Sequence, residues 1–123
     1  LVKDFNADCY RAQSYATSHL IATDLGLSSG QYSVSFQSRL GKLPWIKPYT
    51  DELLPTLYAK GIRNLSVLCP SFVVDCLETL EEIGMQANEQ WSSLGGEQFS
   101  LLPCLNSADF WVDALVKMMM GNA

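Results

Sequence analysis

The fold is decided by the stretch from Asn64 to Glu82, which reads NLSVLCPSFVVDCLETLEE. Apolar side chains recur at every second position of its first third, as in a mostly buried strand: Leu65, Val67 and Cys69. Pro70 and Ser71 then interrupt the extended pattern. A helical pattern follows from Phe72 to about Leu94. The stretch therefore predicts a strand, a tight turn and a long helix.

The predicted helix has an acidic face and an apolar face. At about 100° per residue, one stripe contains Asp75, Glu78, Glu82, Gln86 and Glu89. The opposite stripe contains Val73, Leu77, Leu80, Ala87 and Trp91. An acidic stripe is ordinarily a solvated surface. This one begins one turn after the C-terminal end of a strand, where ligands bind in α/β proteins, so a functional site is the alternative.

The rest of the chain alternates between helical and extended patterns. Helices are predicted at Asp8–Leu25, from Thr50 to a stop at Gly61, and at Ser107–Met120, with Thr50 and Ser107 as caps. Strands are predicted at Tyr32–Gln37, Asn64–Cys69 and Gln98–Leu102. Strands separated by helices form a parallel sheet with right-handed crossovers. The predicted fold class is α/β, a three-layer flavodoxin- or Rossmann-like sheet flanked by helices, which lacks its first strand because no strand precedes the opening helix.

Two of the helices carry features that constrain their packing. Pro55 follows the start of its helix closely and predicts a kink or a displaced start, because its ring clashes with the carbonyl four residues back. The last helix is predicted to face inward with Phe110, Trp111, Ala114, Leu115 and Met118.

Composition excludes several classes of protein. The 123 residues suffice for one domain, and the net charge of −5 with eight dispersed basic residues argues against a nucleic-acid partner. The sequence contains neither a signal-peptide pattern nor an apolar run long enough to cross a bilayer. We expect a cytoplasmic protein, and contact with a membrane surface stays open.

The remaining chemical candidates are a loop, four cysteines and one histidine. The segment Gln37–Tyr49 is rich in Gly and Pro and carries Ser38, Arg39 and Trp45. Long loops of this kind tend to be functional, and the alternative is an ordinary connection with Trp45 packed as a lid over the core. The cysteines have no CxxC spacing, so we expect reduced, buried thiols. His19 is expected to be a surface residue.

Three segments resemble the C-terminal half of bacterial ferrochelatases: SFQSRLGKLPWIKPYTDE (Ser35–Glu52), CPSFVVDCLETLEEI (Cys69–Ile83) and LPCLN (Leu102–Asn106). The resemblance preserves their order and spacing and covers nearly the whole chain. It implies a chelatase-like fold in which two similar lobes, each with a parallel sheet, enclose a porphyrin cleft. Residues 1–123 would then be the C-terminal lobe, a single partial domain whose N-terminal lobe is absent.

The resemblance also implies a reaction and a site. The enzymes insert Fe²⁺ into protoporphyrin IX, or coproporphyrin III in some bacteria. Glu78 matches the glutamate that faces the catalytic histidine across the porphyrin and ligates iron. The other matched residues are Asp75 and Glu82 in the acidic line, and Ser38, Trp45 and Phe72 in the pocket. Insertion releases two pyrrole protons and desolvates the cation, so a carboxylate in the cleft can take protons or guide metal.

The chain departs from the family in ways that shape our expectations. It lacks the Ser-x-His-Gly segment with the catalytic histidine, which His19 does not match, and Cys76 stands where animal members carry a histidine. It also lacks the cysteine-bearing extension of the animal enzymes, so we expect no [2Fe–2S] cluster and no permanently bound cofactor, with Fe²⁺ as a substrate.

We expect residues 1–123 alone to be inactive and to self-associate through unpaired sheet edges and exposed apolar surface. Two alternatives stay open. One is a related tetrapyrrole chelatase that inserts cobalt or nickel, and the other is a non-catalytic flavodoxin-like binding module.

Overall fold

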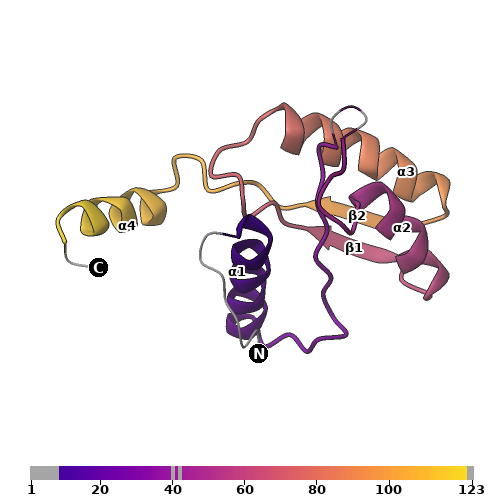
Figure 1. The fold of residues 1–123 in the computed structure, drawn as a ribbon, viewed down its shortest axis with the longest axis horizontal. Coiled ribbons are helices and arrows are strands. Elements are labelled where there is room, and N and C mark those ends of the chain that lie inside the picture. Colours follow the sequence, from indigo (N-terminus) through magenta and orange to yellow (C-terminus); the bar gives the residue numbers. More distant parts are fainter. Residues whose placement is uncertain (1–8, 40, 42, 122–123) are drawn as a thin grey trace. The chain divides into compact units, whose positions relative to one another are not determined.

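The computed structural model describes residues 9–39, 41 and 43–121 (Figure 1). The chain divides into two compact units, Leu1–Gly61 and Ile62–Ala123. Within the parts described, no helix combines the length and the apolar character needed to cross a membrane.

The first unit contains helices α1 (Tyr10–Asp24) and α2 (Thr50–Ala59). Both match the predicted helices, although the expected start of α1 at Asp8 lies outside the described residues. Gly26 ends α1 with a positive φ of 68°, a conformation that glycine adopts without steric cost. The chain then turns back, and the Leu27 amide donates to the Ala22 carbonyl at 2.8 Å.

The predicted strand at Tyr32–Gln37 is wrong. Only Phe36 pairs, in an isolated parallel bridge with Tyr49. Its apolar side chain is buried, and its ring lies 6.5 Å from that of Tyr10 and 6.1 Å from that of Tyr15. The alternating pattern therefore reflects one anchored side chain, because a strand needs a neighbouring strand along its whole length.

Helix α2 begins differently from the prediction. Its N-cap is Tyr49, so Thr50 is the first helical residue and does not cap it. The Thr50 hydroxyl is instead 3.0 Å from that of Ser35. Pro55 lies inside the helix, which starts at Thr50, so the displaced start does not occur, although it was one of the two effects that we expected beside a kink. Leu54, the buried residue of this helix, sits beside the proline in sequence.

The second unit is built on a parallel pair of strands. β1 (Asn64–Val67) pairs with β2 (Gln98–Leu101) in the register Asn64↔Gln98 to Val67↔Leu101. The parallel pairing confirms that prediction, but β1 ends two residues and β2 one residue earlier than expected. The sheet of the described chain has two strands and not three.

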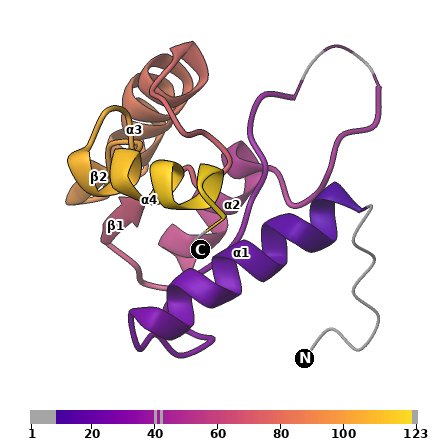
Figure 2. The ribbon, with the colours of Figure 1, turned by 90° about the vertical axis from the view of Figure 1, so that its left-hand side faces the viewer.

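The helix that connects these strands begins later than predicted and is not α-helical at first. It consists of η1, a π-helix (Glu78–Ala87), which continues into α3 (Asn88–Ser93) and runs along β2 (Figures 1 and 2). The expected start at Phe72 is wrong. The backbone N–H of Asp75 donates to the Asn106 side chain, and that of Cys76 donates to the Thr79 side chain, so neither belongs to a helical hydrogen-bond ladder.

The π-helical geometry changes which residues face the core. A π-helix bonds residue i to i+5 and turns more widely than an α-helix, so residues four apart stack nearly on one face. The buried residues follow this spacing: Thr79, Ile83, Ala87 and Trp91. The apolar face predicted from 100° steps is therefore partly wrong, since Leu77 is 73% and Leu80 54% exposed. Gly84 suits the close approach to β2, because a Cβ there would lie 3.3 Å from the Leu101 side chain.

Trp91 is the centre of the second unit. Its side chain is 1% exposed, and its Nε1 donates to the carbonyls of Arg63 at 3.2 Å and Gln98 at 3.1 Å. These carbonyls lie at the starts of the two strands, so one indole ties both to the helix. Gly96 lies against the indole ring, and a Cβ at this position would collide with it.

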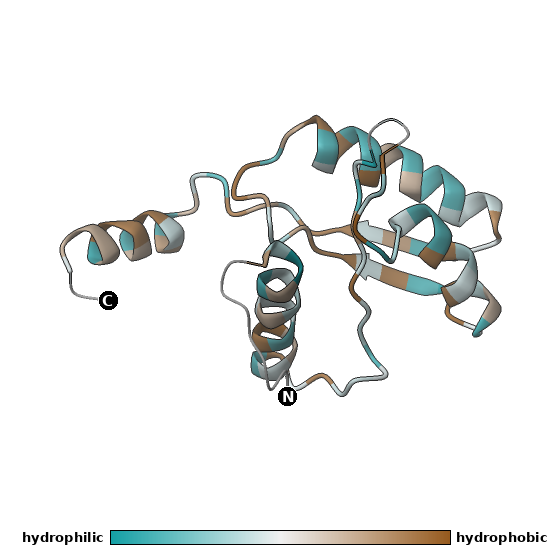
Figure 3. Cartoon of the chain, in the orientation of Figure 1, coloured by the Kyte–Doolittle hydropathy of each residue, from teal (hydrophilic) through white to brown (hydrophobic). Residues whose placement is uncertain are grey.

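Helix α4 (Asp109–Met119) does not bury the apolar face that we predicted. It follows Ala108 as N-cap, and not Ser107, and none of its residues is buried. Much of the helix is coloured as hydrophobic in Figure 3. The prediction of an inward face is wrong for the described chain, and Phe110 is 69% exposed.

We expect Gly96→Ala to lower the free energy of unfolding by about 1–3 kcal/mol, because the added methyl group overpacks the core against Trp91. Urea unfolding followed by far-UV circular dichroism measures the change. Gly30→Ala is the matched control, since nothing lies within 4 Å of a Cβ there and its effect should stay within about 0.5 kcal/mol. Equal midpoints for the two variants would contradict this account of the core.

Candidate functional site

The candidate site lies at the carboxyl ends of β1 and β2, which parallel pairing brings to one edge of the sheet. Asp75 is its most densely bonded residue. Its carboxylate accepts from the Asn106 amide at 2.8 Å, the Thr79 hydroxyl at 3.0 Å and the Cys104 backbone N–H at 3.3 Å. These donors favour the ionised form, and the Asn106 side chain contributes most to a pKa of Asp75 below its ordinary value.

Asn106 is a site residue that sequence reasoning missed. Its Nδ2 also donates to the Cys104 carbonyl at 3.1 Å, and its Oδ1 accepts from the Asp75 backbone N–H at 2.9 Å. Its φ of 49° is in the left-handed region, which asparagine tolerates better than most residues. The available signal was an asparagine three residues after Pro103, where the β2 strand pattern ends.

Glu78 is the first residue of η1, and its side chain is exposed. The pKa of its carboxyl is lowered, chiefly by a hydrogen bond from the Cys76 side chain. The positive end of a helix also favours an acidic residue in its first turn. The carboxylate is therefore ionised at neutral pH, and it can accept a proton or bind a cation.

The acidic stripe differs from the predicted one. Asp75 precedes the helix and so is not part of any helical stripe. Glu82 lies four residues after Glu78, which puts both nearly on one face of the π-helix, and Glu82 is half-buried. Burial raises the pKa of the Cys69 thiol to about 11, assisted by Cys104, Asp75, Cys76 and Glu82. Asp75 and Glu82 thus both lie close enough to the end of β1 to act on Cys69.

The four cysteines are free, as predicted, but only Cys69 is buried and the other three are half-buried. The pKa of Cys104 is raised to about 11 by burial and by its side-chain hydrogen bond to Asp75. Cys69 and Cys104 are therefore neutral thiols at pH 7. Across residues 9–39, 41 and 43–121, no three His, Cys, Asp or Glu side chains are grouped so that they could hold a metal ion.

Ser38 and Trp45 lie in the first unit, in the loop before α2. The indole Nε1 of Trp45 donates to the Gln37 carbonyl at 2.9 Å, which brings the ring beside the Gln37–Ser38 peptide. Trp45 is 38% exposed. Ser38 is half-buried and has a φ of 62°, unusual for a residue other than glycine.

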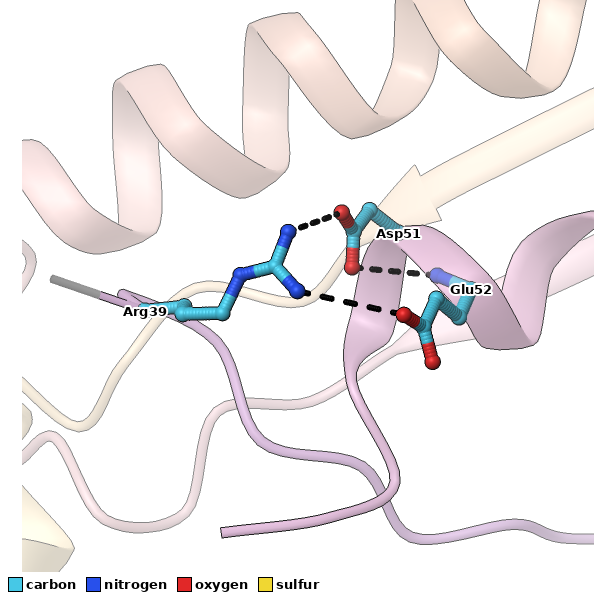
Figure 4. A network of polar contacts seen from close by, with 3 residues as sticks. All are labelled: Arg39, Asp51 and Glu52. Atoms are coloured by element: carbon cyan, nitrogen blue, oxygen red, sulfur yellow. Dashed lines mark hydrogen bonds and ion pairs between the residues drawn. The ribbon is translucent and has the colours of Figure 1, made fainter. Parts of the chain in front are cut away.

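Arg39 fastens the same loop to the start of α2 (Figure 4). Its guanidinium nitrogens lie 3.4 Å from Asp51 Oδ2 and 3.8 Å from Glu52 Oε1, and its Cζ lies 4.5 Å from the centre of the Tyr49 ring. Exposed ion pairs of this kind contribute about 0–1 kcal/mol each. Here they join Arg39 to two acidic residues in the first turn of α2.

Phe72 and His19 complete the predicted candidates. Phe72 is half-buried in the second unit, and its amide donates to the Cys69 carbonyl at 3.0 Å in the turn after β1. The structure therefore places Phe72 in the unit that contains Asp75, Glu78 and Glu82. His19 is exposed, which confirms its predicted surface position.

Comparison with known proteins gives one consistent result. A sequence profile described as Ferrochelatase matches residues 1–123. The ferrochelatase of Legionella pneumophila (strain Corby) is 60% identical over 114 residues, which cover 93% of this chain and 34% of that protein. The ferrochelatase of Coxiella burnetii (strain Dugway 5J108-111) is 56% identical over 117 residues, or 95% of this chain and 33% of that protein. The chain spans about a third of the length of these curated relatives.

We expect Cys76→Ala to raise the pKa of Glu78 toward its ordinary value of 4.5, because the hydrogen bond from the thiol is lost. Because the pKa of Glu78 is lowered in the folded state, its carboxylate stabilises the fold at pH values above the unfolded-state pKa. This stabilisation is lost as the pH falls through the folded-state pKa, and Cys76→Ala should reduce it. Carboxyl ¹³C NMR titration of the two proteins measures the shift. Cys9→Ala is the control, and an unchanged Glu78 titration in Cys76→Ala would refute the assigned contact.

Proposed function

This chain belongs to the ferrochelatase family, and we propose that it is part of an enzyme that inserts Fe²⁺ into protoporphyrin IX or coproporphyrin III during haem biosynthesis. The observation that carries the proposal is the ionised carboxylate of Glu78 at the first turn of η1, beside the carboxyl ends of two parallel strands. In α/β folds this edge of the sheet is where ligands bind.

We propose that Glu78 acts directly on the reacting centre. Insertion exchanges the two pyrrole N–H protons of the macrocycle for Fe²⁺ and releases both protons. An ionised carboxylate can accept a proton as it leaves nitrogen, or supply an oxygen ligand to Fe²⁺ before the pyrrole nitrogens take the metal. Glu82 offers a second carboxylate on the same face of the helix, and Asp75 belongs to the same acidic site.

We propose that Ser38, Trp45 and Phe72 contact the porphyrin. The partial exposure of Trp45 and Phe72 supports this, because an aromatic face left open to solvent can stack on a flat macrocycle. The hydrogen bond from Trp45 to the Gln37 carbonyl fixes the ring beside Ser38, so the two candidates of the first unit would act together.

We propose further that residues 1–123 form the C-terminal lobe of the enzyme. The remaining two thirds of a full-length relative would then supply two parts: the N-terminal lobe, which faces this one across the porphyrin, and the segment just upstream of the first helix, which carries the catalytic histidine. The order and spacing of the three matched segments support the C-terminal placement, and the coverage of about a third of each relative supports the proposal that the chain is part of a longer enzyme.

The direct test uses an enzyme assembled by exchanging the matching third of the Legionella pneumophila ferrochelatase for this chain, hereafter the assembled enzyme. We expect Glu78→Gln to lower its kcat about 10²–10⁴-fold, because the amide can neither accept the proton nor bind the cation as a carboxylate does. Haem formation from Fe²⁺ and protoporphyrin IX is followed by absorbance.

Glu81→Gln is the matched control for this experiment. It removes one charge from the same helix at an exposed position outside the stripe of Glu78 and Glu82, and it should leave kcat within about twofold. A Glu78→Gln enzyme as active as Glu81→Gln would remove Glu78 from the reaction.

We expect residues 1–123 by themselves to form no haem above the uncatalysed rate. The chain corresponds to about a third of its relatives and would supply one wall of the cleft. The purified chain is mixed with Fe²⁺ and protoporphyrin IX without oxygen, and the assembled enzyme serves as the positive control. Turnover by the isolated chain would show that it carries the complete catalytic site.

A further inference from the structure

We infer that Asn106, acting through Asp75, is a positioning residue that fixes the first turn of η1 and thereby the carboxylate of Glu78. The inference rests on the proposed function of Glu78. It also assigns Asp75 to this positioning, in place of proton or metal transfer.

Asn106 binds the segment before η1 with both its backbone and its side chain. Its backbone N–H donates to the Val73 carbonyl at 2.9 Å, and its Oδ1 accepts from the Asp75 N–H at 2.9 Å. Its Nδ2 donates to the Asp75 carboxylate at 2.8 Å. Asn106 thus forms hydrogen bonds to both Val73 and Asp75, and these bonds join segments 31 residues apart in the sequence.

The contact continues from Asp75 to the residues on either side of Glu78. Thr79, which is 0% exposed, donates its hydroxyl to Asp75 at 3.0 Å, and the same oxygen accepts from the Cys76 N–H at 3.0 Å. The Cys76 carbonyl in turn accepts from the Leu80 amide at 2.9 Å. Because Cys76 and Thr79 are both fixed, the backbone that carries the exposed Glu78 side chain has little freedom.

The hydrogen bonds of Asp75 also favour positioning over transfer. Both carboxylate oxygens already accept from fixed donors, namely the Thr79 hydroxyl, the Asn106 amide and the Cys104 N–H. A carboxylate that passes protons must release such donors in each turnover. A carboxylate that orients a helix must keep its hydrogen-bond donors throughout.

The conformation of Asn106 determines which substitutions are informative. With a φ of 49°, alanine would strain the backbone, whereas glycine adopts this conformation freely. Asn106→Gly therefore removes the side-chain contacts with little change in the turn. Ser107→Gly is the matched control, because it adds a glycine to the same turn at an exposed residue.

In the assembled enzyme we expect Asn106→Gly to lower kcat about 10–100-fold, with KM for the porphyrin within about twofold, because a misplaced catalytic group slows chemistry without weakening substrate binding. Hydrogen exchange of the amides of residues 76–80 should become at least about tenfold faster. Ser107→Gly should change neither quantity. An unchanged kcat in a folded Asn106→Gly enzyme would overturn the inference.

A paired exchange separates positioning from proton transfer. Asp75→Asn alone should lower kcat, and adding Asn106→Asp should recover at least about tenfold, because an amide at 75 can donate to a carboxylate at 106. If Asp75 instead transfers protons, the double variant stays as slow as Asp75→Asn, and our inference fails.

Two further outcomes are decided by the same set of proteins. If Asn106→Gly does not fold, Asn106→Asp takes its place, since it keeps the Oδ1 acceptor and removes only the donor; full activity of this variant would overturn the inference. If the unsubstituted assembled enzyme makes no haem, the proposed function fails, while hydrogen exchange still decides whether Asn106 holds the first turn of η1.

Discussion

The parallel pairing of β1 with β2 is the constraint on which the candidate site depends. It puts the carboxyl ends of both strands at one edge, so the residues that follow them meet although they are far apart in the chain. Asp75 and Asn106 are the clearest example, since they exchange two hydrogen bonds across 31 residues of sequence. Trp91 secures the opposite ends of the strands, where one indole N–H bonds to two carbonyls. The sheet is small, but both of its ends are fixed by side chains from the connecting helix or its flanking turns.

The connecting helix shows how a tertiary contact selects local geometry. Nothing in the composition of Glu78–Ala87 favours a π-helix over an α-helix, and the sequence alone predicted the commoner form. The structure uses the wider turn to bring Thr79 and Trp91 onto one buried face. π-helical turns are rare and are frequent at functional sites. Because the helix starts only at Glu78, Asp75 lies outside it and Glu78 is its first carboxylate.

Features that depend on local chemistry were predictable from the sequence, and features that depend on distant partners were not. The strands around Leu65 and Phe99 and the stop of α1 at Gly26 follow from alternation and from glycine chemistry. The extended pattern around Phe36 failed because pairing needs a second strand, which a pattern cannot supply. Asn106 was missed for a related reason, since its role depends on a partner 31 residues away. The family resemblance singled out Glu78 as a candidate, whereas the hydrogen bonds of the residues around it, Cys76 and Thr79, could be found only in the structure.

The four-residue spacing of the buried face has a consequence for how this segment can evolve. A substitution at one position from Thr79 to Trp91 changes the contacts of that side chain and leaves the other residues in register with the sheet. Inserting or deleting one residue would instead rotate everything on one side of the change out of phase with the sheet. Either the indole would leave the strand ends or the acidic face would turn away from the sheet edge. The segment therefore tolerates substitutions more readily than insertions or deletions.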